Sequence, residues 1–165
     1  MSFLSTYSPR NVVVNYAGAL FNSGRTDDVF VSITEGAERI STRKGLSGDT
    51  SVALSSDHSC TISLTFYPES QSGKIMTGLY HGLKKAERNG TVVLGVSPLI
   101  IVDPSGSVFL TCNEAVLRSK SDTTLGADTA TVTFDFYVES ATQGALPDEY
   151  SNEVIAALNY LGVAV

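Results

Sequence analysis

The sequence predicts an α+β domain that is mainly β. Three observations predict this class: apolar and polar residues alternate in several short segments, turn-forming residues separate these segments, and two stretches show helical spacing of apolar residues. The chain has 165 residues, which is within the size of one domain, and it contains no internal repeat or linker. We therefore expect residues 1–165 to form a single domain, with residues 141–165 as an extension of it.

Two segments give the clearest strand signal. Residues 60–67 and 131–140 each have an apolar residue at every second position, so one face of each strand is predicted to be buried. The positions predicted to be buried are Ile62, Leu64, Phe66, Val132, Phe134, Phe136 and Val138. The opposite face of the later segment carries Thr131, Thr133, Asp135, Tyr137 and Glu139. Both strands are expected to have one face in contact with water.

Further strands are expected where weaker alternation is flanked by Gly, Asn, Asp or Ser residues. They span residues 12–16, 29–34 and 50–54. Residues 92–102 form a nearly continuous apolar run that ends at the turn sequence Asp103-Pro104-Ser105-Gly106. This turn predicts a hairpin between the apolar run and residues 107–118.

Two segments are predicted to be helices. The first spans residues 72–89, where apolar residues recur at three- and four-residue spacing and where Ser70 or Ser72 can cap the start. The face of this helix that we expect to be buried carries Ile75, Leu79 and Leu83. The second helix spans about residues 148–161 and has acidic residues in its first turn, where the helix dipole favours them.

The charge balance bears on the kind of partner that the chain can bind. The net charge is −6, which argues against a protein that holds nucleic acid by neutralising phosphates. Only 17% of the residues are charged, fewer than the ~25% of typical soluble domains, so a partner is expected to cover part of the surface. The sequence shows no signal-peptide pattern and no apolar run long enough for a membrane span. We therefore expect a protein made in the cytoplasm that has no membrane partner.

The common motifs for cofactor, phosphate and metal sites are absent from the sequence, so we expect no enzyme activity, no catalytic residues, no metal and no cofactor. His58 and Cys60 suggest a thiol–imidazole pair or, together with Asp57, a metal site. The alternative, which we favour, is a loop that leads into a strand, because no third orienting group accompanies the pair. Cys60 and Cys112 are expected to be reduced thiols and not a disulfide.

Three local features follow one another along the chain: a glycine-containing loop, a Ser-x-Asp turn before a strand and a helix, and a late hairpin. Residues 43–49 place a Gly-x-x-Gly loop between two strands, and a Ser-x-Asp turn at Ser55 and Asp57 then precedes an apolar strand and a Ser-capped helix. Residues 98–106 form the late hairpin. From about residue 11 to residue 140, this order resembles the tail tube proteins of contractile-tailed, myovirus-like bacteriophages.

The resemblance implies a fold and a role. It implies two packed antiparallel sheets that form a sandwich or barrel with a flanking helix, and subunits that form hexameric rings. The rings stack into the inner tail tube, through which the genome passes into the host without specific DNA binding. The implied partners are further copies of the chain, the tail sheath protein, the tape-measure protein, and the baseplate and tail terminator proteins. The implied location is the tail of the virion, assembled in the cytoplasm of the bacterial host.

The resemblance also implies three sets of contact residues. The loop expected to cross to the adjacent ring carries Arg43, Lys44, Gly45, Gly48 and Asp49. Acidic candidates for the lumen, on the polar face of the last long strand, are Asp135 and Glu139. Candidates for contact with the sheath, at the end of the first helix, are Lys84, Lys85 and Arg88.

Two other functions remain open at this point. The first is the inner tube of a tailocin or of a type VI secretion-like contractile machine, which would share the fold. The second is a monomeric β-sandwich module that binds, for instance, carbohydrate. Such modules usually present aromatic platforms, and this chain has no Trp.

Overall fold

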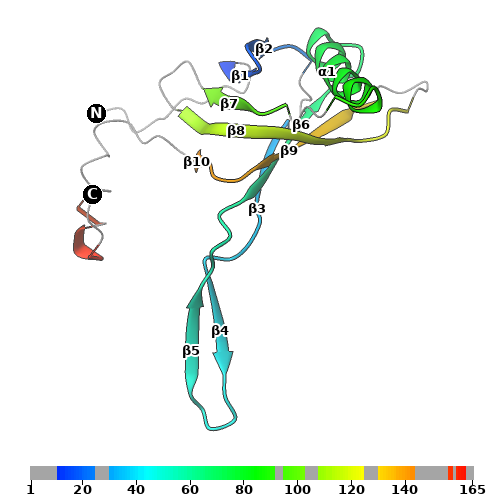
Figure 1. Ribbon diagram of the computed structural model, residues 1–165. Helices are drawn as coiled ribbons and strands as arrows, with labels where there is room; N and C mark the ends of the chain where they lie inside the picture. Colours follow the sequence, from blue (N-terminus) through cyan, green and yellow to red (C-terminus); the bar gives the residue numbers. More distant parts are fainter. Residues whose placement is uncertain are drawn as a thin grey trace, which may run out of the picture.

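The computed structural model describes residues 11–24, 30–91, 95–102, 108–124, 130–143, 156–157 and 159–162. These residues form ten strands and one helix (Figure 1). The strands make two antiparallel sheets, so the predicted fold class, an α+β protein that is mainly β, is confirmed.

The main sheet contains eight of the strands. Its order is β2 (Ala19–Phe21), β1 (Val13–Tyr16), β7 (Ser97–Val102), β8 (Val108–Lys120), β9 (Val132–Val138), β6 (Cys60–Phe66) and β3 (Val31–Glu35). The short strand β10 (Thr142–Gln143) also pairs with β8. The pairing of β7 with β8 confirms the predicted late hairpin, whose turn at residues 103–106 lies outside the described residues. The second sheet is the hairpin of β4 (Ile40–Lys44) and β5 (Thr50–Leu54).

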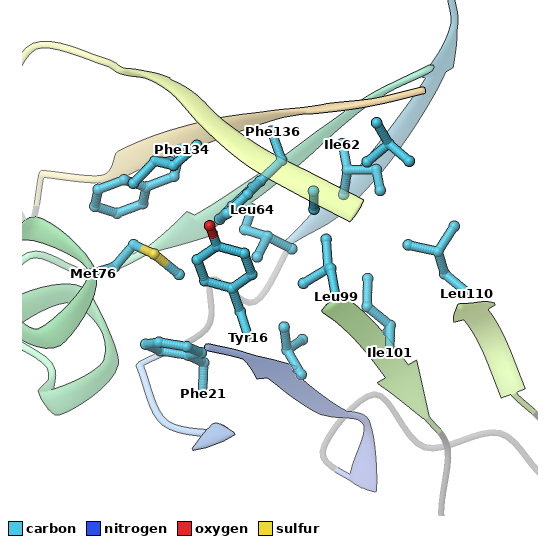
Figure 2. Packing of buried hydrophobic residues seen from close by; sticks show 14 of the residues in the cluster. Tyr16, Phe21, Ile62, Leu64, Met76, Leu99, Ile101, Leu110, Phe134 and Phe136 are labelled. Atoms are coloured by element: carbon cyan, nitrogen blue, oxygen red, sulfur yellow. The ribbon is translucent and has the colours of Figure 1, made fainter. Parts of the chain in front are cut away.

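The main sheet coils so that its two halves pack against each other. The ring of Tyr16 in β1 lies 4.8 Å from the ring of Phe136 in β9, although β7 and β8 separate these strands in the sheet. Figure 2 shows side chains from both halves meeting in one cluster. The long strand β8 belongs to both halves, and its register with β9 shifts between Leu117 and Ser119. Such a bulge bends a strand and increases its twist, which helps the sheet to close on itself.

Alternation in the sequence accounts for the core. In β6 and β9, every residue predicted to be buried is at most 3% exposed, and the residues between them are partly or fully exposed. These side chains form one cluster with buried residues of β1, β2, β7 and β8. The polar face of β9 therefore points away from the core, as the sequence predicts.

The helix α1 (Gln71–Arg88) starts and ends at the predicted signals. The Oγ of Ser70 accepts a hydrogen bond from the N–H of Gly73 at 3.1 Å, and Asn89 caps the other end. Met76 is fully buried, whereas Ile75, which we expected on the buried face, is 38% exposed. The prediction for Ile75 was wrong because the face set by Gly73 and Met76 enters the core, and Ile75 lies ~100° around the helix from Met76.

The remaining differences concern segments at the edges of the fold. Strands β2, β4 and β10 were not predicted. In the predicted second helix, the described residues 156–157 and 159–160 are helical, and the start of this helix lies outside the described residues. Within the described part of the chain, we find no helix with the length and apolarity needed to cross a membrane.

Candidate functional site

The hairpin β4–β5 projects from the body of the domain (Figure 1). It continues strands β3 and β6 through a link in which the N–H of Gly36 donates to the carbonyl of Ser59 at 2.8 Å. The N–H of Ser55 closes the base of the hairpin by donating to the carbonyl of Arg39 at 2.9 Å. Every residue of both hairpin strands is exposed, so the described part of the chain leaves this hairpin uncovered.

The hairpin has two different faces. Cross-strand partners in an antiparallel pair point to the same side, and the pairs Ile40–Leu54 and Thr42–Val52 therefore share one face. On that face, Ile40, Val52 and Leu54 are 37%, 60% and 75% exposed. The opposite face carries Ser41, Arg43, Ser51 and Ala53. We call the face with Ile40, Thr42, Val52 and Leu54 the apolar face of the hairpin.

The predicted inter-ring loop is the tip of this hairpin. Arg43 and Lys44 end β4, while Gly45, Gly48 and Asp49 belong to the turn. The N–H of Gly45 donates to the carbonyl of Asp49 at 2.8 Å, and Gly48 has a φ of 89°, which favours glycine. The structure thus places all five predicted residues together at the far end of the projection. Whether they contact another ring stays a prediction.

A groove lies between α1 and the strands β8 and β9. Its volume is about 600 Å³. It is lined by apolar or aromatic groups, by cations and by carboxylates: Tyr80, Leu83, Lys84, Glu87, Val96, Glu114, Val116, Leu117, Arg118, Tyr137 and Glu139. The Nζ of Lys84 lies 4.8 Å from the ring centre of Tyr80, and the guanidinium carbon of Arg118 lies 4.9 Å from that of Tyr137. We call this surface the α1–β8 groove.

The two lumen candidates have different surroundings. Asp135 lies on the face of β9 away from the core, where its carboxylate accepts hydrogen bonds from Ser63 at 2.6 Å and from Ser119 at 3.2 Å. Glu139 follows β9, is exposed, and lines the α1–β8 groove. Asp135 therefore links three neighbouring strands, and Glu139 is available to a partner.

The three sheath candidates are together at the end of α1. Lys84, Lys85 and Arg88 are all exposed. Lys85 and Arg88 belong to the last turn, where positive charges interact favourably with the helix dipole. Lys84 also reaches over the ring of Tyr80. The structure shows that these cations are accessible, and a contact with a sheath stays a prediction.

The alternative chemistry at Asp57, His58 and Cys60 has no supporting geometry. His58 is exposed, whereas Cys60 is buried and is a free thiol, as is Cys112. The carboxylate of Asp57 accepts a hydrogen bond from the N–H of Ser59 at 2.9 Å, so it belongs to a turn. Among the described residues, no group of three or more His, Cys, Asp or Glu side chains is arranged to hold a metal ion.

The sequence interpretation missed the apolar face of the hairpin and the α1–β8 groove. The alternation in residues 50–54 was a signal for the first, since it placed Val52 and Leu54 on one face. No sequence signal marked the groove, because its residues come from three elements and a loop that are far apart in the chain.

Comparison with known proteins gives a likeness in fold. No protein-family model and no curated protein sequence matches the chain. One similar solved structure is the sheath/tube terminator of an extracellular contractile injection system, PVC, in the extended state. Its sequence is 12% identical to this chain, and the TM-score is 0.51. The match covers 87% of this chain and 100% of the terminator chain. Another is the tube-terminating cap of the anti-feeding prophage, with 12% identity and a TM-score of 0.49. This match covers 88% of this chain and 95% of the cap chain. The likeness to the PVC terminator is therefore one of fold.

Proposed function

We propose that this protein is a structural subunit of a contractile tail or tail-like injection particle, and that it acts by binding further copies of itself in a ring at the end of the tube. The observation that carries the proposal is the projecting hairpin, whose apolar face is uncovered in the monomer. The fold likeness to a sheath/tube terminator supports the choice of particle.

The exposed hairpin favours self-assembly for an energetic reason. Burying a Val, Leu or Ile side chain contributes roughly 1.5–3 kcal/mol, so leaving Ile40, Val52 and Leu54 in water forgoes stabilisation that a partner can supply. A two-stranded ribbon with no packed face is also marginally stable by itself. A second copy of the chain that covers this face would stabilise both the hairpin and the assembly.

A second candidate is the tail tube itself, built from stacked hexameric rings. The position of Gly45, Gly48 and Asp49 at the far end of the projection favours it, because a tip so placed can reach a neighbouring ring. In either assembly, Asp135 is a candidate for an acidic lumen that repels DNA and lets it pass, and Glu139 is a second candidate where no neighbouring subunit covers the α1–β8 groove that it lines. Lys84, Lys85 and Arg88 are the candidates for contact with the sheath. Tape-measure and baseplate proteins are further proposed partners, and tailocin or secretion particles remain alternatives to a phage.

Negative-stain electron microscopy of the concentrated, purified protein tests this proposal. A terminal component is expected to form discrete rings, and a tube protein is expected to form rings that stack into long tubes. Particles that stay monomeric at all concentrations would contradict both proposals and would favour a monomeric binding module. A matched sample in which Ile40, Val52 and Leu54 are each replaced by Ser should show neither rings nor tubes.

A further inference from the structure

We propose that the apolar face of the hairpin in one copy binds in the α1–β8 groove of a second copy. This inference rests on the proposed self-assembly and names the two surfaces that meet. The occupant of the groove is thus residues 39–54 of a neighbouring subunit.

The apolar parts of the two surfaces suit each other. In the groove, Val96 is 48% exposed and Tyr137 is 37% exposed, and Leu83 and Leu117 extend the apolar lining. The hairpin presents a row of aliphatic side chains at Ile40, Val52 and Leu54. Both patches are small and are rimmed by charged residues, which is the usual composition of a protein interface.

The charges of the two surfaces are complementary. Three carboxylates line the groove, those of Glu87, Glu114 and Glu139, and none of them has a hydrogen-bond or ion-pair partner among the described residues. The cations in the groove, Lys84 and Arg118, lie over aromatic rings.

The hairpin carries mainly positive charge, opposite to that of the three carboxylates in the groove. Between residues 39 and 54 it has the cations Arg39, Arg43 and Lys44, of which Lys44 lies on the apolar face and the other two on the opposite face, and a single acid, Asp49, which accepts a hydrogen bond from Ser47 in the turn. The side chains of the three cations have no ion-pair partner among the described residues. Lys44 follows Ile40 and Thr42 on the apolar face, so it would enter the groove together with them.

The contact joins two copies because a copy cannot make it with itself. Figure 1 shows the hairpin extending away from the body and from α1, so a hairpin does not reach its own groove. The two surfaces are different parts of the chain, which makes the contact heterologous: each subunit gives a hairpin and receives one. Heterologous contacts propagate around a ring when the rotation closes, and into a helical filament when it does not. This geometry suits a ring-shaped component.

Cross-linking between two variants, each of which gains one exposed cysteine, tests the contact. Val52→Cys and Val96→Cys, carrying different affinity tags, are mixed and treated with a short bifunctional thiol reagent; Cys60 and Cys112 are buried and remain in place. We expect cross-linked heterodimers that link hairpin to groove. The matched control replaces Val52→Cys by Ser51→Cys, which lies on the opposite face of the hairpin and should give far fewer heterodimers.

Charge reversal gives a second, independent readout. Lys44→Glu is expected to weaken assembly about tenfold or more, because it brings a carboxylate to an acidic groove. Glu114→Lys in the groove should restore assembly when the two changes are combined in one chain. Two results would overturn this contact while leaving self-assembly intact, provided that the wild-type protein forms rings. One is cross-linking of Val52→Cys to Val96→Cys that is no better than that of the Ser51→Cys control, and the other is a Lys44→Glu defect that Glu114→Lys does not relieve. A wild-type chain that stays monomeric would overturn both.

Discussion

The ring of Tyr16 meets the ring of Phe136 edge to face at 4.8 Å, across two intervening strands of the same sheet. This contact shows that the sheet has coiled onto itself, since flat neighbours so far apart in strand order would not touch. The hydroxyl of Tyr16 also donates a hydrogen bond to the carbonyl of Gly95 at 2.9 Å, so it ties β1 to the segment that leads into β7.

Phe136→Ala is expected to reduce the free energy of unfolding by about 3–5 kcal/mol, because it removes a fully buried ring and leaves a cavity between the two halves of the sheet. Denaturant unfolding followed by circular dichroism measures the effect. The control is Tyr137→Ala on the opposite face of the same strand, which should cost about 1 kcal/mol or less. Equal losses in the two variants would contradict the assigned orientation of β9.

The strands with the clearest signal in the sequence are those with one buried face. β6 and β9 alternate clearly because one face of each strand enters the core. β4 was not predicted, since its sequence has one apolar residue, Ile40, and therefore shows no alternation. β2 has only three residues and gives too short a pattern. The groove escaped prediction because it depends on how α1 lies against β8, which tertiary packing decides.

The glycines of α1 should respond to alanine in opposite directions. A Cβ at Gly73 would overlap the carbonyl oxygen of Tyr67, whereas a Cβ at Gly78 would meet nothing within 4 Å. Gly78→Ala is therefore expected to raise the free energy of unfolding by up to about 1 kcal/mol through the higher helix propensity of Ala. Gly73→Ala should lower it, and thermal unfolding compares the two. Stabilisation by Gly73→Ala would show that this helix is not packed as closely as described.

Asp135 is expected to contribute to stability independently of any role in a lumen. Asp135→Ala removes the acceptor of two hydroxyl groups, those of Ser63 and Ser119, and should cost about 1–2 kcal/mol. Glu139→Ala, which removes an exposed carboxylate, should change the free energy of unfolding little. Unfolding curves for the two variants must therefore be measured before any test of genome passage, because a loss of stability in Asp135→Ala would itself impair such a test. A neutral Asp135→Ala would contradict the bridging role.

The two buried, free thiols are expected to make the free energy of unfolding depend on pH in the alkaline range. Burial raises the pKa of Cys60 and of Cys112 above the ordinary value of 9.0, so both stay protonated in the folded protein at a pH where the unfolded chain ionises them. Their contribution to stability is complete below about pH 8.5 and is lost as the pH rises past the unfolded pKa.

The free energy of unfolding should accordingly fall as the pH rises past the ordinary thiol pKa of 9.0, and fall less steeply in a Cys60→Ala, Cys112→Ala variant. Both thiols should also react slowly with a maleimide in the native protein at pH 8 and rapidly in denaturant. Fast labelling of the native protein would contradict their burial.

The central claim is that the uncovered hairpin holds subunits together, and light scattering after size-exclusion chromatography measures it most directly. The samples are the wild-type protein, a variant with Ile40→Ser, Val52→Ser and Leu54→Ser, and a control with Ser41→Thr, Ser51→Thr and Ala53→Ser on the opposite face. Since each buried aliphatic side chain contributes ~1.5–3 kcal/mol, the first variant should associate at least ~100-fold more weakly. We predict oligomers for the wild type and the control, and monomers that still unfold cooperatively, without the stabilisation that assembly adds, for the serine variant. A monomeric wild type, or a serine variant that assembles as well as the wild type, would contradict the account.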